Sequence, residues 1–268
     1  MLIALVSLDQ RWLDKEVNFA RCVELVRVAT EQGCALVVFP EMTLTGYSLD
    51  MPSIAESADD SLTMRRFLEL AHDAAVEIIF GACLLDSVSG NPQNTLCLAR
   101  HEGVVSVIYS KIHPFSFVGE DKILQAGSSL GFANVEDLRL GCSICYDLRF
   151  PEIFSAMTPH CNAMINIANW PSRRVSHWRT LLIARAIESQ LFVLGVNRIG
   201  TDGNGLQYEK STMAVAPDGA VLAPVFFTDE IDIYDIDPDE TNRHRTEFPT
   251  VRDKRYALYR DIFGGNVC

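Results

Sequence analysis

In the stretch Arg139-Leu-Gly-Cys-Ser-Ile-Cys-Tyr-Asp-Leu-Arg-Phe-Pro-Glu152, an apolar strand stops at Cys145 and a turn begins. A strand end fixes the direction of one side chain, and the turn behind it leaves backbone N–H groups free for a developing oxyanion. Two more reactive side chains follow apolar runs in the same way: Glu41 ends residues 35–41, and Lys111 ends residues 104–111. A carboxylate, an ammonium and a thiol at strand ends are what an acyl-transfer site on the rim of a sheet requires.

Around this stretch, apolar runs of strand length alternate with amphipathic runs of helix length, which predicts an α/β fold. We expect strands over residues 2–8, 35–39, 77–84, 138–145, 163–168, 191–196 and 231–236, and helices over 14–32, 61–75 and 175–189. Residues 94–100 with 104–110, and 213–216 with 220–225, are predicted hairpins, and a polar tail ends the chain. No linker-like segment interrupts the pattern, so we expect one domain over residues 1–268.

The net charge of −12 argues against a nucleic-acid partner, because the chain has no basic stripe to displace counterions from phosphates. No apolar run approaches the ~18 residues of a membrane span, and residues 1–8 lack the basic start and cleavage site of a signal peptide. Eight cysteines at irregular spacing then indicate reduced thiols, and we expect a cytoplasmic protein without a membrane partner.

Three short motifs carry the glutamate, the lysine and the cysteine in this order: Phe39-Pro-Glu41, Tyr109-Ser-Lys111-Ile-His113 and Ile144-Cys145-Tyr-Asp-Leu-Arg149. Together they resemble the nitrilase superfamily of carbon–nitrogen hydrolases, and the resemblance covers most of the chain. Further segments look most like its omega-amidase branch: Asn166-Ile-Ala-Asn-Trp-Pro171, His177-Trp178, Ala184-Arg-Ala-Ile-Glu188 and Asn197-Arg-Ile-Gly-Thr-Asp-Gly-Asn-Gly205. The resemblance implies a four-layer α-β-β-α sandwich, which composition alone does not show.

The resemblance also implies a role for each reactive residue. Cys145 is the nucleophile, Glu41 takes its proton, and Lys111 stabilises the tetrahedral oxyanion together with the N–H of Tyr146. Glu120 lies where related enzymes often carry a second glutamate that positions the lysine or the attacking water. We expect Cys145 to be a low-pKa thiol that iodoacetamide alkylates much faster than the other seven cysteines. Neither a metal nor another cofactor is expected, since the chain has no H-E-x-x-H motif and no histidine pair at i and i+4.

Other interpretations of these residues stay open at this point. A free cysteine is most often a small buried hydrophobe, and Cys142 with Cys145 forms a C-x-x-C pair of the kind found in redox and zinc sites. An extended strand directs these two side chains to opposite faces, so Cys142 is expected to pack below the site. The competing catalytic arrangement is a Cys–His pair with His113 or His177 as the base. Residues 200–205 are predicted to form a tight loop that borders the pocket.

For the substrate, the resemblance implies short dicarboxylate monoamides such as 2-oxoglutaramate and 2-oxosuccinamate. A cationic clamp has to hold the remote carboxylate against the negative field of the whole protein. Arg174 matches a position that related sequences keep basic, and Arg173 and Arg149 are alternatives. The candidates for the pocket wall are aromatic: Tyr47, Phe115 and Trp170.

Other activities and assemblies are compatible with the same residues. Deaminated glutathione, N-carbamoyl amino acids and nitriles are alternative substrates for the same glutamate, lysine and cysteine. A non-catalytic scaffold of the same fold is the alternative outside enzymes. Because members of the family usually form dimers or larger assemblies, the resemblance also implies a homo-oligomer.

Overall fold

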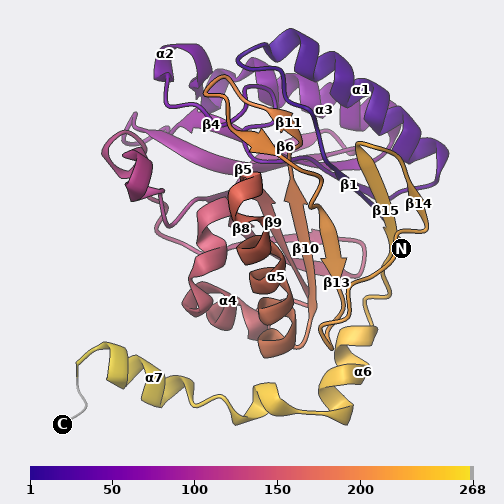
Figure 1. The fold of residues 1–268 in the computed structure, drawn as a ribbon, viewed down its shortest axis with the longest axis vertical. Helices are drawn as coiled ribbons and strands as arrows, with labels where there is room; N and C mark the ends of the chain where they lie inside the picture. Colours follow the sequence, from indigo (N-terminus) through magenta and orange to yellow (C-terminus); the bar gives the residue numbers. More distant parts are fainter. Residues whose placement is uncertain (266–268) are drawn as a thin grey trace.

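The structure, a computed structural model that describes residues 1–265, stacks two β-sheets between two layers of helices (Figure 1). The larger sheet contains, in spatial order, β14 (Phe226–Phe227), β15 (Ile231–Asp235), β1 (Leu2–Val6), β2 (Leu36–Val38), β4 (Glu77–Leu85), β5 (Pro92–Arg100) and β6 (Val104–Ser110), and β3 (Glu56–Ser57) pairs with β4. The smaller sheet contains β13 (Met213–Val215), β10 (Phe192–Asn197), β9 (Ala163–Ala168), β8 (Leu138–Ile144) and β7 (Gly131–Val135). A separate pair consists of β11 (Gly200–Thr201) and β12 (Gln207–Tyr208).

The helices form the two outer layers. The larger sheet is covered by α1 (Lys15–Glu31) and α3 (Leu62–Ala74), and the smaller sheet by α4 (Pro151–Met157) and α5 (Val175–Ser189) (Figure 1). The remaining helices are α2 (Met51–Ile54), α6 (Glu240–Glu247) and α7 (Tyr256–Phe263). The side chains of Asp14 and Ser61 cap α1 and α3 by accepting backbone N–H groups at 3.1 Å. None of the helices within residues 1–265 is long and apolar enough to cross a membrane.

Three apolar cores fill the spaces between the four layers. The central core lies between the two sheets, and one further core lies under each helical layer. Strand β10 shows how one sequence serves two cores: Phe192, Leu194 and Val196 point to the other sheet, while Val193 points to α5. Side chains that alternate between two buried faces give the continuous apolar runs seen in the sequence. The four-layer α-β-β-α sandwich is therefore confirmed.

Two predicted segments differ from the structure. Residues 220–225 do not form a strand; after the turn at Pro217 and Asp218 they make one bridge, between Val221 and Val215, before the short β14. The C-terminal region is not simply a polar tail, because α6 and α7 form within it. α6 has no apolar face, and the apolar face of α7 covers only eight residues, none of them buried, so neither helix stands out in the polar sequence of this region.

The strand directions determine where a site can form. β1, β2 and β4 run parallel, and so do β8, β9 and β10. Because β6 is antiparallel to β5 and β5 to β4, β6 ends at the same edge as β4. Loops that follow the carboxyl ends of parallel strands share one edge, which is where α/β proteins bind ligands.

Candidate active site

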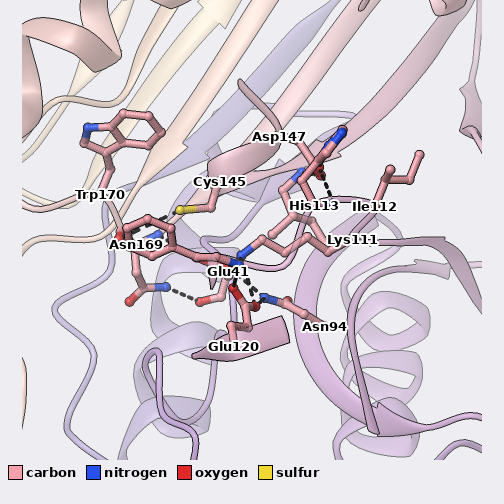
Figure 2. Close-up of polar contacts among 12 residues, drawn as sticks. Glu41, Asn94, Lys111, Ile112, His113, Glu120, Cys145, Asp147, Asn169 and Trp170 are labelled. Atoms are coloured by element: carbon pink, nitrogen blue, oxygen red, sulfur yellow. Dashed lines mark hydrogen bonds and ion pairs between the residues drawn. The ribbon is translucent and has the colours of Figure 1, made fainter. Parts of the chain in front are cut away.

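The predicted catalytic residues follow the carboxyl ends of strands, and the fold brings these ends together (Figure 2). Glu41 comes three residues after β2, Lys111 follows β6, and Cys145 follows β8. Asn169 follows β9, and Glu120 begins the short 3₁₀ helix Glu120–Lys122. The cluster therefore draws on both sheets, and its geometry depends on how the two sheets pack.

Cys145 occupies a strained turn at the end of β8. It is the first residue of the 3₁₀ helix Cys145–Arg149 and has a φ of +47°, which is uncommon for a residue other than glycine and is found most often at functional sites. Its side chain is half-buried, and its sulfur lies 4.0 Å from the Asn169 carbonyl oxygen. Tyr146 is the second residue of this helix, so its N–H has no acceptor within the helix. An N–H of this kind is what an oxyanion donor requires.

The loop that carries Glu41 is shaped by a close approach to β4. Met42 has a φ of +46°, so the chain turns sharply just after the carboxylate. Gly81 of β4 lies against this turn: a Cβ there would be 2.5 Å from Met42 N and 2.9 Å from Glu41 Cα. Both contacts are with backbone, which cannot move aside as a flexible side chain can. Only glycine at position 81 therefore leaves Glu41 in place.

Gly81→Ala is expected to lower kcat/KM for the amide substrate by about 10²-fold, because a shift of Glu41 by roughly 1 Å removes it from reach of the reacting atoms. Gly195→Ala is the matched control. Its new Cβ would press on the Leu182 side chain in the α5 layer, 2.4 Å away, which strains the fold without displacing Glu41. Thermal unfolding and kcat/KM should be measured for both variants. A Gly81→Ala enzyme within about threefold of wild type would show that this approach does not position the carboxylate.

Lys111, Glu41 and Glu120 form a buried charge cluster (Figure 2). Lys111 Nζ donates to Glu41 Oε1 at 3.1 Å and to Glu120 Oε2 at 2.9 Å. Their side chains are 1 %, 0 % and 0 % exposed. Burial alone would lower the pKa of Lys111, but the charges of Glu41 and then Glu120 overcome this effect and raise that pKa well above its ordinary value. Lys111 is therefore a permanent ammonium, as oxyanion stabilisation requires.

The thiol of Cys145 differs from the sequence-based expectation of a low pKa. Burial and, after it, the negative charge of Glu41 raise the pKa of Cys145 well above its ordinary value, and Lys111 offsets only part of this. The resting sulfur is thus a neutral thiol. A thiol of this kind can act as a nucleophile only if a nearby base takes its proton during the attack.

Two asparagines to which the sequence analysis gave no role hold the cluster in place. Asn169 donates its backbone N–H to Glu41 Oε2 at 2.9 Å and its Nδ2 to the Glu41 carbonyl oxygen at 2.7 Å. Asn94 Nδ2 donates to Glu41 Oε1 at 2.8 Å and to Glu120 Oε1 at 3.1 Å. Both are buried and lie close to strand ends. The sequence shows a polar residue at one end of an apolar run in each case, but not the contact with Glu41.

Neither histidine considered as an alternative base is hydrogen-bonded to Cys145 among the described residues. His113 Nδ1 lies 2.8 Å from Asp147 Oδ1, and Figure 2 shows the ring beside Asp147 and away from the sulfur. His177 is exposed in the first turn of α5, 3.5 Å from Arg149 Nη2. The geometry therefore gives the Cys–His arrangement no support. No hydrogen bond joins Cys145 to Glu41 among the described residues either, so Glu41 as the base stays a prediction.

Asp147, two residues after the candidate nucleophile, is a buried carboxylate that joins two loops. It accepts hydrogen bonds from Tyr109 Oη at 2.7 Å, Ile144 N at 3.0 Å and His113 N at 3.0 Å. Tyr109 and His113 flank Lys111 in the sequence, whereas Ile144 precedes Cys145. The carboxylate therefore fastens the turn of the thiol to the loop of the ammonium, across the boundary between the two sheets.

Cys142 lies apart from the thiol of Cys145. It is fully buried in the core between the sheets, so it packs below the site as predicted. Burial also raises its pKa to about 12. Within residues 1–265, no group of three or more histidine, cysteine, aspartate or glutamate side chains is placed to hold a metal ion. That the site works without a metal stays a prediction.

Cys145 and Lys111 line the same pocket. Every residue predicted for substrate binding also lines it: Tyr47, Phe115, Tyr146, Arg149, Trp170 and Arg174. Leu206 and Tyr208 line part of the wall, but none of residues 200–205 does, so the expectation that this loop borders the pocket is not confirmed. Glu41 does not line the pocket and lies in the buried cluster behind it.

Three arginines line the same pocket, and none has an ion-pair partner among the described residues: Arg149, Arg173 and Arg174. The Arg149 guanidinium lies 4.7 Å from the Trp170 ring, and that of Arg174 lies 5.6 Å from the Phe115 ring. Burial and then the charge of Arg173 lower the pKa of Arg174. This uncompensated positive charge attracts an anionic ligand to a protein whose net charge is −12.

A four-layer α-β-β-α sandwich with a glutamate, a lysine and a cysteine gathered at its strand ends defines a class of hydrolases that act on carbon–nitrogen bonds. The family model for carbon–nitrogen hydrolases matches residues 2–246, and the chain belongs to that family. Membership confirms the resemblance seen in the motifs around Glu41, Lys111 and Cys145.

The chain is similar to two amidases over most of its length. It is 34 % identical to the 2-oxoglutaramate amidase of Bacillus subtilis (strain 168), over 84 % of this chain and 86 % of the relative. It is 31 % identical to the omega-amidase YafV of Escherichia coli (strain B / BL21-DE3), over 82 % and 83 %. Among solved structures it is similar to XC1258 of Xanthomonas campestris, a CN-hydrolase superfamily protein with an arsenic adduct in its active site. The TM-score is 0.86 and the identity 29 %, covering 95 % of this chain and 97 % of that one.

Proposed function

We propose that the protein is an amidase that hydrolyses a small carboxylate-bearing amide, such as 2-oxoglutaramate or 2-oxosuccinamate, to the acid and ammonia. The observation that carries the proposal is one pocket that joins Cys145 and Lys111 to three arginines without ion-pair partners among the described residues. The thiol and the ammonium suit acyl transfer at one end of a substrate, and the arginines suit an anion at the other. The relatives named 2-oxoglutaramate amidase and omega-amidase support the same substrate class.

In the first half of the proposed reaction, the Cys145 sulfur attacks the amide carbon while Glu41 takes the thiol proton. Lys111 and the Tyr146 N–H stabilise the oxyanion that forms on the carbonyl oxygen. Glu41 then returns the proton to the leaving nitrogen, the carbon–nitrogen bond breaks, and ammonia departs. A thioester on Cys145 remains. The raised pKa of Cys145 is compatible with this order, because the thiol keeps its proton until the base is in use.

In the second half, water attacks the thioester carbon. Glu41 accepts a proton from the water, assisted by Glu120, which keeps Lys111 in position through its contact at 2.9 Å. The carbon–sulfur bond breaks, the acid is released, and the sulfur recovers its proton from Glu41. Each proton taken up by Glu41 is thus given back within the same half-reaction, so the cycle needs no external acid, base or metal.

A substrate panel tests the proposal directly. The purified protein should be assayed for ammonia release with 2-oxoglutaramate, 2-oxosuccinamate, succinamate, deaminated glutathione, N-carbamoyl amino acids and a short nitrile. We expect the highest kcat/KM for the short carboxylate-bearing amides. Preference for one of the last three would move the assignment to that activity, and no turnover of any compound would favour a non-catalytic scaffold.

Arg174→Ala is expected to weaken turnover of the anionic amide selectively. The change removes a charge-assisted contact to the remote carboxylate while leaving Glu41, Lys111 and Cys145 untouched. We expect kcat/KM for 2-oxoglutaramate to fall by about 10-fold or more, which corresponds to the loss of one hydrogen bond to a charged group. A neutral short amide should lose much less. The two substrates should be compared in the same preparation.

Arg173→Ala and Arg149→Ala are the matched variants, because both side chains line the same pocket. If Arg174→Ala lowers both substrates equally, a disturbed α5 explains the result better than a lost clamp. If it lowers neither, the carboxylate is held elsewhere, and the variant that does discriminate between the two substrates identifies the clamp.

The proposal includes a homodimer or larger homo-oligomer, as the family resemblance implies. α7 supports it, since this helix extends away from the body and has no buried residue (Figure 1). Its aromatic side chains Tyr256, Tyr259 and Phe263 follow helical spacing, and Phe263 is 76 % exposed. Light scattering at several concentrations should give a dimer or larger species, and Phe263→Asp should shift it toward monomer. A monomeric wild type would reject this part of the proposal.

The proposal also includes the cytoplasmic location predicted from the sequence. The seven cysteines within residues 1–265 are all free thiols. This pattern suits a reducing compartment. Cell fractionation with an antibody against the protein would test it.

A further inference from the structure

Asn94, near the start of β5 in the larger sheet, contacts most of the buried charge cluster. It belongs to β5, and its backbone carbonyl accepts the N–H of Lys111 at 2.9 Å. Its side-chain Nδ2 donates to Glu41 Oε1 at 2.8 Å and to Glu120 Oε1 at 3.1 Å. The residue is 1 % exposed and does not line the pocket, so the substrate does not reach it. One asparagine is thus bonded to three of the four residues that carry the proposed reaction.

The orientation of the amide is fixed by its surroundings. Nδ2 points at two carboxylate oxygens, and rotation of the amide would place Oδ1 there, where it would be repelled by both. Oδ1 itself is buried and has no hydrogen-bond partner among the described residues. An unsatisfied buried acceptor is costly, and an apolar side chain of the same shape would avoid that cost. The presence of an asparagine here is therefore explained by the hydrogen bonds that Nδ2 donates, and not by a contribution to the stability of the core.

The two carboxylates share their donors in an unusual way. Lys111 Nζ also contacts both Glu41 Oε1 and Glu120 Oε1, each at 3.1 Å. The same two oxygens are therefore bridged twice, once by a cation and once by a neutral amide. The Lys111 ammonium lowers the repulsion between the two glutamates, but in the proposed reaction it also has to stabilise the oxyanion. The Asn94 amide is a second bridge between the same two oxygens, and it carries no charge.

We propose that Asn94 is a positioning residue that holds Glu41 and Glu120 side by side, so that Glu41 keeps its alignment with Cys145 through both halves of the reaction. The inference deepens the proposed function and rests on it for the roles of the two glutamates. Its effect should appear in the chemical step. We expect variants at position 94 to lower kcat by about 10² or more, the range for a lost general base, and to leave KM within about threefold.

Two variants and one control test this. Asn94→Asp keeps the shape of the side chain but replaces the amide donor with an acceptor. Because this adds a third buried carboxylate beside Glu41 and Glu120, the variant can fail to fold. Asn94→Ser removes the amide without adding a charge. Thr95→Val is the matched control: Thr95 is the next residue of β5, is also buried, and bonds to the Ala82 carbonyl oxygen, with no contact to either glutamate. We expect Thr95→Val to keep wild-type kcat and a folded circular dichroism spectrum.

A double-mutant cycle separates positioning from general damage to the fold. If Asn94 acts through the glutamates, the loss of kcat in Asn94→Ser/Glu120→Gln is smaller than the product of the two single losses by about fivefold or more. If it only supports the sheet, the losses multiply. Multiplicative losses, a folded position-94 variant with kcat within threefold of wild type, or an equal loss in Thr95→Val would each overturn the inference.

A substrate-independent measurement distinguishes failure of this inference from failure of the proposed function. Alkylation of Cys145 by iodoacetamide requires removal of the thiol proton but no hydrolysis of a carbon–nitrogen bond. We expect Asn94→Ser and Asn94→Asp to slow it as much as Glu41→Gln does, and Thr95→Val to leave it unchanged. If wild type hydrolyses no amide but the alkylation pattern holds, the proposed function fails and the role of Asn94 stands. Wild-type alkylation rates in the Asn94 variants would reject that role.

Discussion

Cys145→Ser is expected to abolish amide hydrolysis, with kcat lowered by about 10³ or more, while the fold stays intact. A serine hydroxyl is far less acidic than a thiol, and the carboxylate of Glu41 is too weak a base to activate it. The strained turn at position 145 accepts serine as well as cysteine, because the two side chains differ by one atom. Ammonia release and circular dichroism should be measured on the same preparation.

The control for this variant is Cys142→Ala, three residues earlier, on β8. Cys142 lies in the core between the sheets, so its truncation should cost about 1 kcal/mol of stability and leave kcat close to wild type. If Cys145→Ser keeps more than a tenth of the wild-type activity, Cys145 is not the nucleophile. If both variants are inactive and unfolded, the comparison should be repeated with Cys145→Ala.

Glu41→Gln should stop formation of the thioester, with a loss of about 10²–10⁴-fold, the usual contribution of a positioned general base. Glutamine keeps the shape and can still accept the Asn94 amide, but it cannot take a proton. His113→Ala and His177→Ala should lower activity only modestly, since His113 bonds to Asp147 and His177 is exposed. Single-turnover measurements would show whether the acyl-enzyme forms in each variant.

These three variants decide between two mechanisms. An inactive histidine variant together with an active Glu41→Gln would establish the Cys–His pair in place of the glutamate. A modest loss in His113→Ala is still expected on the glutamate mechanism, because His113 helps Asp147 to fasten the thiol turn to the lysine loop.

The reactive residues could be found from the sequence because each ends an apolar run. An apolar run of strand length predicts a buried strand, and the first charged residue after it has to lie at the sheet edge. Glu41, Lys111 and Cys145 all follow this pattern, and the family motifs supplied their grouping. The helices α1 and α3 could also be predicted from the sequence, because Asp14 and Ser61 are capping residues at their starts.

The supporting residues could not be found in this way. Asn94 and Asp147 act through contacts between segments 26 to 53 residues apart in the sequence, and nothing local in the chain encodes those distances. The raised pKa of Cys145 likewise depends on burial and on Glu41, more than a hundred residues away. The helix α7 was missed because its short apolar pattern has no partner within the described chain.

The buried pair of glutamates has a consequence for the end of the catalytic cycle. Hydrolysis turns a neutral amide group into a new anion, and this anion forms beside two carboxylates that share one ammonium. With both glutamates ionised, the cluster carries one excess negative charge, which tolerates the amide but repels the acid made from it. The arginines at the other end of the pocket hold substrate and product alike. The glutamate pair therefore weakens binding of the product relative to the substrate, and so lowers inhibition by the accumulating acid.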